Sequence, residues 1–282
     1  MVWICVCAAG RLGALRTLGF LVGDRMTALL YESSRALVFH GRWQEVLPIV
    51  GSVDVTITDP PYSEHVQENI RSVDTRGSVR VRKWDCDFAS LSDFEHVPAF
   101  LAATARWTLC FCALEQFGDY LRAAGGQCSA KAPGAQYVRS WVWRKMQAAP
   151  QLSGDRPANS CEGIAVMHRP GKKRWNGHGQ HAWTDLEREE FADVGVDNSC
   201  QFGRIRGREK LHPTEKPPPL CDHLVAKFSE PGEVVGDWYC GSGQIACAAI
   251  RAGRCAVACD SDLRWAEHSA RAVEAAERGL AG

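Results

Sequence analysis

The sequence predicts an α/β fold built around one β-sheet. Two observations carry this prediction. Segments with strand and helix periodicity alternate along the chain, and a strand, a glycine turn and a helix follow one another at residues 233–252. A length of 282 residues with 45% hydrophobic content is sufficient for one sizeable α/β core with room for a modest insertion.

The spacing of apolar residues places the expected elements in chain order. Residues 53–58 alternate as a strand, and Phe94, Val97 and Phe100 recur at helical spacing. The expected strands are 53–58, 108–113, 137–143, 163–168, 233–236 and 255–259. The expected helices are 94–106, 114–124, 217–228 and 244–252.

A short motif, Asp59-Pro60-Pro61-Tyr62, ends the first of these strands. Because proline cannot continue a sheet ladder, we expect Asp59 at the carboxyl end of the strand, the edge at which open α/β sheets bind ligands. The fixed φ angles of the two prolines hold the turn stiffly, so that Asp59 and Tyr62 face one point. The tetrapeptide is also compatible with a turn that only ends a strand.

The residue types in this turn suit a flat substrate that carries an amine. The exocyclic amine of adenine or cytosine is a weak nucleophile, because its lone pair is delocalised into the ring. The Asp59 carboxylate and the Pro60 carbonyl could each accept one N–H hydrogen bond while Tyr62 stacks on the ring. The motif therefore favours a site at which such an amine is activated.

A second motif, Asp237-Trp238-Tyr239-Cys240-Gly241-Ser242-Gly243, joins the strand at 233–236 to the helix at 244–252. Gly241 and Gly243 allow the backbone to approach a ligand, and the N–H groups at the start of the helix can bind a carboxylate such as that of a methionine moiety. Asp260 ends the next strand, where an acid binds ribose hydroxyls in dinucleotide-type folds. The motif therefore favours a cofactor loop.

Together with His212-Pro213-Thr214-Glu215-Lys216-Pro217, the two motifs resemble those of the S-adenosylmethionine-dependent DNA amino-methyltransferases, in the order of the β subgroup. The resemblance covers residues 36–275. It implies a Rossmann-like fold with a mostly parallel sheet, one antiparallel edge pair and helices on both faces. It also implies an enzyme that methylates N6 of a flipped adenine in DNA, with S-adenosyl-L-methionine as cofactor.

The resemblance also assigns roles to residues. It implies that Asp59, Pro60, Pro61 and Tyr62 are catalytic. The residues that it implies for the cofactor site are His212, Pro213, Thr214, Lys216, Asp237, Tyr239, Gly241, Gly243 and Asp260.

This chain departs from the usual pattern of the family at three positions of the cofactor motif. Trp238 stands where the family usually has Pro, Tyr239 where it has Phe, and Gln244 where it has Thr. Tyr239 keeps an aromatic wall against the cofactor. Trp238 and Gln244 put the cofactor affinity in question and leave a non-enzymatic alternative open, a DNA-binding protein descended from a methyltransferase.

The target base is open between two amines. In the family an Asp at the first catalytic position accompanies N6-adenine methylation more often than N4-cytosine methylation, so that adenine is favoured and cytosine is the alternative. Methylation of RNA or of a protein glutamine is a further alternative, although enzymes with those activities typically begin the motif with Asn and place the cofactor motif first.

Basic residues gather in two stretches that are candidates for DNA contact. Residues 63–85 follow the catalytic turn and could close over a flipped nucleotide, or form a solvated surface loop. Residues 131–175 carry nine basic residues against two acidic ones, with Trp141 and Trp143 expected in the core. The residues expected to bind nucleic acid are Arg80, Lys83, Arg144, Lys145, Lys172, Lys173, Arg174 and Arg206.

Composition limits the alternatives. The formal net charge is zero, so any affinity for DNA has to come from local patches. None of the thirteen cysteines forms a Cys-x-x-Cys pair, and Cys110, Cys112, Cys255 and Cys259 are expected to be small buried side chains. We therefore expect no disulfide framework, no metal site and a reducing, cytoplasmic compartment.

The predicted organisation is one methyltransferase domain over 26–282, with a target-recognition insertion at about 146–211 and a cofactor-binding part at about 212–282. Residues 1–25 are expected to be an N-terminal extension ahead of a plausible start at Met26, or else a short helix packed on the domain. The expected partner is double-stranded DNA, with no membrane. A monomer or homodimer is expected, and a restriction endonuclease partner is compatible with the sequence but not readable from it.

Overall fold

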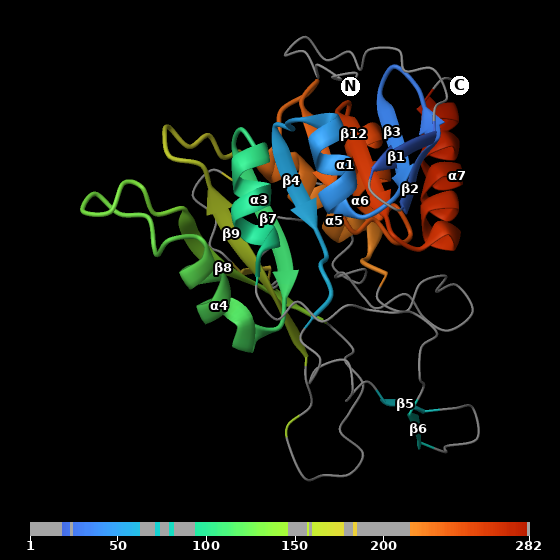
Figure 1. Ribbon diagram of the computed structural model, residues 1–282. Coiled ribbons are helices and arrows are strands. Elements are labelled where there is room, and N and C mark those ends of the chain that lie inside the picture. The colour runs from blue at the N-terminus through green and yellow to red at the C-terminus, as the bar shows by residue number, and fades with distance from the viewer. Residues whose placement is uncertain are drawn as a thin grey trace.

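The computed structural model describes residues 19–22, 25–62, 71–73, 79–81, 94–145, 157, 160–177, 183–184 and 215–280. Ten of its strands form one sheet in the order β1-β2-β3-β12-β11-β4-β7-β9-β8-β10 (Figure 1). They are β1 (Gly19–Val22), β2 (Arg25–Glu32), β3 (Ala36–His40), β4 (Val55–Thr58), β7 (Trp107–Cys112), β8 (Tyr137–Arg144), β9 (Cys161–His168), β10 (Trp183–Thr184), β11 (Val234–Asp237) and β12 (Cys255–Asp260). A separate antiparallel pair consists of β5 (Arg71–Val73) and β6 (Val79–Val81).

The centre of the sheet is parallel, as the resemblance implies. β3, β12, β11, β4 and β7 are parallel neighbours in that order. On one side β9 is antiparallel to both β7 and β8, which gives the expected antiparallel pair. On the other side the sheet is extended by β2 and β1, each antiparallel to its neighbour, which the sequence did not predict.

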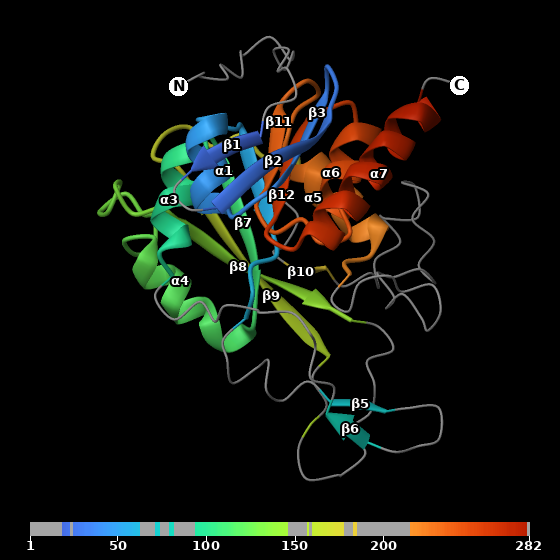
Figure 2. The same ribbon diagram turned by 45° about the vertical axis from the view of Figure 1, so that its right-hand side comes forward.

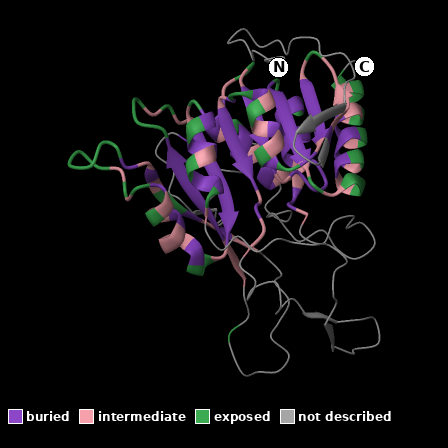
Figure 3. Ribbon diagram, in the orientation of Figure 1, coloured by how far each residue is buried: buried purple, intermediate pink, exposed green. Residues whose placement is uncertain are grey.

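Helices cover both faces of the sheet (Figures 1 and 2). One face carries α1 (Trp43–Val50), α3 (His96–Ala103) and α4 (Phe117–Ala123), which follows the 3-10 turn Leu114–Gln116. The other carries α5 (Pro218–Phe228), α6 (Gln244–Arg251) and α7 (Leu263–Leu280). The result is a three-layer arrangement in which the central strands of the sheet are buried in the middle, drawn in purple in Figure 3.

The period of two in the strands determines which side chain meets which helix layer. In β4, Val55 and Ile57 pack in the core beneath α5, α6 and α7. Thr56 and Thr58 are also fully buried, and both bond to groups of the cofactor motif: the Thr56 hydroxyl accepts from Trp238 Nε1 at 3.2 Å, and the Thr58 hydroxyl accepts from Trp238 N at 3.1 Å. The strand before the catalytic turn is therefore buried on both faces.

Trp238 belongs to the core rather than to an open loop. Its side chain is 1% exposed and lies beside Phe100 of α3, with ring centroids 6.0 Å apart. Its indole N–H donates to Thr56, and its backbone carbonyl accepts a hydrogen bond from the Cys259 thiol at 3.4 Å. The departure from the family pattern at this position is therefore accommodated as a packed, hydrogen-bonded core residue.

Two predicted boundaries of the domain organisation lie close to strands of the sheet. Gly19–Val22, ahead of Met26, pairs with β2 as an edge strand. Within the predicted insertion at 146–211, β9 pairs with β7 and β8 and its residues 163–168 are buried. The domain boundaries themselves stay predictions. Residues 1–18 and most of the remaining insertion lie outside the described residues.

Several expectations about burial are confirmed. Cys110, Cys112, Cys255 and Cys259 are buried. Trp141 and Trp143 are each 3% exposed and lie in the core, as expected. Among the described residues, no helix has the length and apolar composition needed to cross a membrane.

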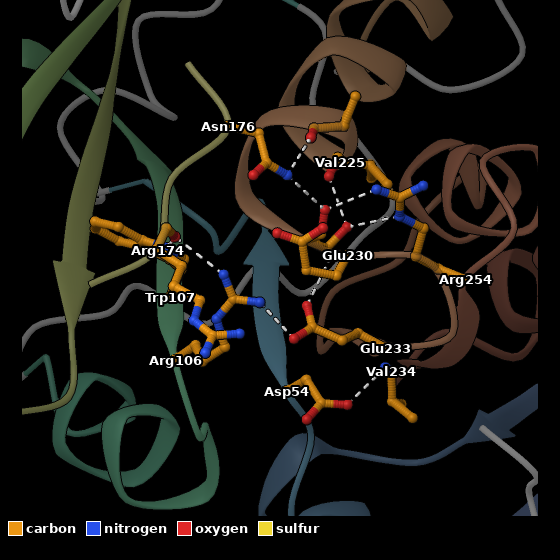
Figure 4. A network of polar contacts seen from close by, with 12 residues as sticks. Asp54, Arg106, Trp107, Arg174, Asn176, Val225, Glu230, Glu233, Val234 and Arg254 are labelled. Carbon is orange, nitrogen blue, oxygen red and sulfur yellow. Dashed lines mark hydrogen bonds and ion pairs between the residues drawn. The ribbon is translucent and has the colours of Figure 1, made fainter. Parts of the chain in front are cut away.

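Polar contacts close the amino-terminal edge of the parallel strands (Figure 4). Arg106, just before β7, forms an ion pair with Glu233, just before β11. Arg106 Nη2 and Trp107 Nε1 both donate to the backbone carbonyl of Arg174, at 3.0 and 2.6 Å. These contacts fix the segment after β9 against this edge.

A second part of the same network holds the end of α5. Arg254 Nη2 donates to the carbonyl of Ser229 at 2.7 Å, and Asn176 Nδ2 donates to the carbonyls of Ala226 and Ser229 at 3.2 Å each. Such contacts satisfy carbonyls that a helix end leaves without intrahelical partners. The residues around this edge therefore stabilise the fold.

Replacement of Trp238 by Phe is expected to reduce stability without a large effect on ligand binding. The change removes the indole hydrogen bond to Thr56 and some buried volume, which together should lower the free energy of unfolding by about 1–3 kcal/mol. Urea denaturation measures this loss. Calorimetry with S-adenosylmethionine is the accompanying control, and an affinity reduced by more than about tenfold, or 1.4 kcal/mol, would contradict the assignment of Trp238 to the core.

Candidate active site

Three acidic side chains meet at the carboxyl edge of the central strands. Asp59 follows β4, and Asp237 and Asp260 are the last residues of β11 and β12. Because β4, β11 and β12 are parallel neighbours, their carboxyl ends lie at the same edge. The structure therefore brings the catalytic motif and the cofactor motif together, although about 180 residues separate them in the chain.

The two oxygens of Asp59 have different environments. Oδ2 accepts a hydrogen bond from Lys216 Nζ at 2.7 Å. Oδ1 is buried and has no hydrogen-bond partner among the described residues. Burial raises the pKa of Asp59, while the nearby Lys216 ammonium opposes that rise. One strong acceptor atom therefore stays available at the end of β4.

Lys216 connects Asp59 to a second carboxylate that the sequence did not reveal. Its ammonium lies 3.2 Å from Glu162 Oε2, and the other oxygen of Glu162 forms an ion pair with Lys145. Burial alone would lower the pKa of Lys216, but the charges of Asp59 and Glu162 outweigh this effect and raise it. Lys216 was predicted to bind the cofactor, and this role stays a prediction; in the structure its ammonium contacts Asp59.

Glu162 left only a weak signal in the sequence. It is one of the two acids in the basic stretch 131–175, and it lies near the start of a strand. Its proximity to Asp59 depends on β9 running antiparallel to β7, which places Gly163 beside Cys112 at the carboxyl edge. Local periodicity contains no information about that direction.

Two aromatic rings flank the Lys216 ammonium. The Nζ atom lies 5.7 Å from the ring centroid of Tyr62 and 4.7 Å from that of Phe111. Both distances are within the range of cation–π attraction. Tyr62 therefore lies near Asp59, as the motif predicted, and Phe111 of β7 is an additional aromatic residue at this point.

Thr58 links the catalytic strand directly to the cofactor motif. Its hydroxyl donates to Asp237 Oδ1 at 2.9 Å and accepts from Trp238 N at 3.1 Å. Burial raises the pKa of Asp237 to about 7, and the hydrogen bond from Thr58 opposes this rise by stabilising the ionised form. Thr58 therefore orients Asp237 and sits one residue before Asp59.

The glycine loop is shaped by Asp260 and by α7. Gly241 N donates to Asp260 Oδ2 and Asp262 N donates to Oδ1, each at 2.9 Å. Gly243 has φ +79°, and a Cβ atom there would lie 2.6 Å from Ser269 Oγ and 3.1 Å from Ser269 Cα. Only glycine satisfies both the backbone angle and the contact with α7 at this position.

Gln244 and Tyr239, two of the departures from the family pattern, both have defined contacts. Gln244 Nε2 donates to Glu215 Oε1 at 2.9 Å, which ties the first residue of α6 to the His-Pro-Thr-Glu-Lys-Pro motif. Tyr239 is half-buried, and its ring lies edge-on to Phe100 with centroids 6.5 Å apart. Both residues thus lie where the cofactor motif meets the rest of the domain.

The loop fits S-adenosylmethionine, which the resemblance implies. The first N–H groups of α6 have no acceptors within the helix and can bind the carboxylate of the methionine moiety. Asp237 offers a carboxylate for the ammonium group. Asp260 accepts two backbone N–H groups and retains lone pairs for ribose hydroxyls.

The residues predicted to bind DNA are divided between the two edges of the sheet. Arg144 ends β8 and Lys145 follows it, both at the carboxyl edge. The segment with Lys172, Lys173 and Arg174 follows His168, which pairs with Trp107 at the opposite edge. The basic residues at 172–174 are therefore separated from the candidate site. Their predicted contact with DNA would lie on another part of the surface.

The remaining predicted positions can be placed only in part. Arg80 lies in β6, within the stretch expected to close over a nucleotide. Lys83, Arg206, His212, Pro213 and Thr214 lie outside the described residues.

Comparisons with known proteins agree with the fold and the motifs. The family model for DNA methylases, of the N6/N4 type, matches residues 53–271. The type II methyltransferase M2.LlaDCHI of Lactococcus lactis subsp. cremoris is 23% identical over 256 residues, which are 86% of this chain and 91% of that protein. The type II methyltransferase M2.DpnII of Streptococcus pneumoniae is 23% identical over 143 residues, 50% of this chain and 53% of that protein.

Solved structures of DNA methyltransferases have the same fold. The cytosine-N4-specific PvuII DNA methyltransferase gives a TM-score of 0.55 at 12% identity and covers 90% of this chain and 95% of its own. The complex of M1.HpyAVI with S-adenosylmethionine gives a TM-score of 0.53 at 15% identity, with 78% of this chain and 88% of that chain covered.

Replacement of Thr58 by Val should weaken S-adenosylmethionine binding about tenfold at pH 7, because the ionised Asp237 loses a hydrogen bond. Binding that needs ionised Asp237 declines as the pH falls through the pKa of about 7, and the substitution should shift this midpoint to higher pH. Calorimetry over a pH series measures both effects. Thr58→Ser should retain normal binding, and Thr56→Val is the control for loss of a buried hydroxyl that bonds to no carboxylate. An unchanged midpoint in Thr58→Val would refute the role of Thr58.

Replacement of Gly243 by Ala should be more destabilising than replacement of Gly253 by Ala. Both glycines have positive φ angles, +79° and +77°, but a Cβ atom at Gly253 would have no neighbour within 4 Å. The clash with Ser269 should therefore cost the Gly243 variant about 1–3 kcal/mol more in the free energy of unfolding. Parallel chemical denaturation of both variants measures the difference, and equal losses would show that α7 does not restrict the loop.

Proposed function

The chain belongs to the N6/N4 DNA methylase family, and from this premise we propose that it transfers a methyl group from S-adenosylmethionine to the N6 amine of a flipped adenine in double-stranded DNA. The observation that supports the proposal is the buried Oδ1 of Asp59, an acceptor without a partner among the described residues, at the strand end beside the cofactor motif. A buried acceptor of this kind is costly unless a donor completes it. The N–H group of a bound base would be that donor.

The catalytic turn supplies the remaining contacts for the amine. Asp59 Oδ1 accepts one N–H hydrogen bond and the Pro60 carbonyl accepts the other, which directs the nitrogen lone pair away from the ring. Tyr62 stacks on the base and fixes its plane. When bound, the cofactor provides an electrophilic methyl group next to this nitrogen. Burial of Asp59 raises its pKa, which makes the carboxylate a stronger acceptor for the proton that the methylated amine must lose.

Adenine is favoured over cytosine by the Asp at the first catalytic position. Cytosine N4 is the alternative target, because the same pair of acceptors would fit its amine. The PvuII enzyme, which shares the fold, is cytosine-N4-specific. The fold does not distinguish the two targets, and the labelling experiment below does.

We also propose a setting for the activity. Two relatives are type II methyltransferases, the class that pairs with restriction endonucleases, and a comparable partner for this chain is a proposal. We further propose a cytoplasmic compartment, which the free cysteines among the described residues support.

Incubation with unmethylated duplex DNA and isotope-labelled S-adenosylmethionine tests the function. After digestion to nucleosides, mass spectrometry should find the label in N6-methyladenine. Label in N4-methylcytosine would establish the alternative target. Intact cofactor binding with no label in either nucleoside would refute the proposal and direct attention to RNA or protein.

Replacement of Asp59 by Ala should reduce turnover by roughly 10²–10⁴-fold, the usual contribution of a positioned polar group, and leave cofactor binding nearly intact. Replacement of Asp260 by Ala should have the opposite profile and weaken cofactor binding first, because Asp260 holds Gly241 of the loop. Calorimetry and single-turnover methylation assays on both variants separate the two effects. Full activity in Asp59→Ala would show that the catalytic assignment is wrong.

A further inference from the structure

Four charged side chains from four segments meet beside the catalytic turn. Lys216 contacts Asp59 at 2.7 Å and Glu162 at 3.2 Å, and Glu162 also pairs with Lys145. The exposed fractions of the four side chains lie between 6% for Lys216 and 21% for Lys145. Two cations and two anions thus form a neutral, largely buried cluster, of which only Asp59 and Lys216 belong to recognised motifs.

Lys216 lies over the aromatic ring on which the target base is proposed to stack. Its ammonium is bonded to Asp59, the acceptor of the target amine, and lies over the rings of Tyr62 and Phe111. A base that stacked on Tyr62 and donated to Asp59 would meet this ammonium. Lys216 is bonded to Oδ2 of Asp59, and the proposed acceptor of the amine is Oδ1, so the conflict arises at the Tyr62 ring. Lys216 therefore has to move off this ring, and with it away from Asp59 Oδ2, when the base stacks there.

A buried ammonium cannot simply leave its partner, because the other charge would be left uncompensated. Glu162 offers a second partner, because its Oε2 already lies 3.2 Å from Lys216 Nζ. A small movement of the ammonium exchanges one carboxylate for the other.

From this geometry we propose that Glu162 is a positioning residue for methyl transfer, which shares the Lys216 ammonium with Asp59 and takes it over when the target amine binds to Asp59. The inference rests on the proposed function and adds to it a residue outside the catalytic and cofactor motifs.

Lys145 keeps Glu162 ready for this exchange. Burial alone would raise the pKa of Glu162, but Lys216 and Lys145 lower it to about 2, so that Glu162 is anionic at every pH at which an enzyme of this kind works. Lys145 also lies over the ring of Trp143, at 5.4 Å from its centroid, which limits its movement. When Lys216 contacts Asp59, Lys145 compensates the charge of Glu162.

Glu162 and Lys145 shift the pKa of Asp59 in opposite directions, and the pH dependence of the methylation rate measures these shifts. The described titratable groups that act on Asp59, or on which Asp59 acts, are Lys216, Glu162, Lys145, Tyr62, Tyr120, Asp237, Cys110 and Cys112. Burial raises the pKa of the two thiols and of the Tyr62 and Tyr120 hydroxyls, so these groups stay neutral near pH 7. Glu162 raises the pKa of Asp59 and Lys145 lowers it.

Replacement of Glu162 by Gln tests the proposal. Lys216 then has Asp59 as its remaining carboxylate partner and stays over the Tyr62 ring, where the base has to stack. The single-turnover rate should therefore fall by about 100-fold, the usual effect of a misplaced reacting group. Loss of the Glu162 charge lowers the pKa of Asp59, so the decline of the rate on acidification should move to lower pH. The assay uses saturating S-adenosylmethionine, so that ionisation of Asp237 does not limit the rate.

Replacement of Glu233 by Gln is the matched control. Glu233 is 19% exposed, against 14% for Glu162, and its ion pair with Arg106 lies at the opposite edge of the sheet. This variant should show a comparable loss of thermal stability with an unchanged rate and pH profile. If Glu162→Gln and Glu233→Gln behave alike, Glu162 is a structural residue and the proposal is overturned.

Replacement of Lys145 by Gln provides a second test that does not depend on the folding of the Glu162 variant. Because Lys145 lowers the pKa of Asp59, its loss should move the acidic decline of the rate to higher pH, opposite to the shift in Glu162→Gln. An unchanged profile, or a shift to lower pH, would overturn the proposal. Wild-type protein that transfers no label to DNA would overturn the proposed function itself, whereas an active wild type with unshifted variants would overturn this inference alone.

Discussion

The parallel pairing of β4 with β11 is the constraint on which the candidate site depends. It places the end of the catalytic strand beside the end of the cofactor strand, and the register sets Thr58 next to Trp238. Thr58 is the residue before Asp59, and its hydroxyl can then donate a hydrogen bond to Asp237. A shift of this register by one residue would direct Thr58 to the other face of the sheet and break the link between the two motifs.

Burial of charge determines the rest of the site. A carboxylate at the end of a buried strand requires a cation, and Lys216 provides it for Asp59. A lysine that is 6% exposed requires more than one carbonyl or carboxylate partner, and Glu162 supplies the second. Lys145 then balances Glu162. Each member of the cluster is explained by the charge of its neighbour, so the four side chains act as one unit.

The two edges of the sheet use similar residues for different purposes. At the amino edge, Arg106 and Glu233 form an ion pair whose surroundings are backbone carbonyls and helix ends (Figure 4). At the carboxyl edge, the ion pairs surround an acceptor atom of Asp59 that has no partner among the described residues. The difference between the two edges lies in the motifs that the ion pairs adjoin rather than in the type of residue, because only the carboxyl edge carries Asp59 beside the glycine loop. The departures at Trp238 and Gln244 fit a structural role, because each forms a defined hydrogen bond inside the domain.

The sequence by itself determined the α/β class, the order of the central elements and the positions of Asp59, Asp237, Gly243 and Asp260 at turns. These features depend on local periodicity and on the backbone limits of proline and glycine, which are written into neighbouring residues. The tertiary structure alone decided that Glu162 and Lys145 join the site and that residues 172–174 lie at the opposite edge. Both outcomes follow from the antiparallel direction of β9 against β7 and β8. Hydrogen bonds between residues far apart in the chain determine this direction, and the local sequence pattern does not predict it.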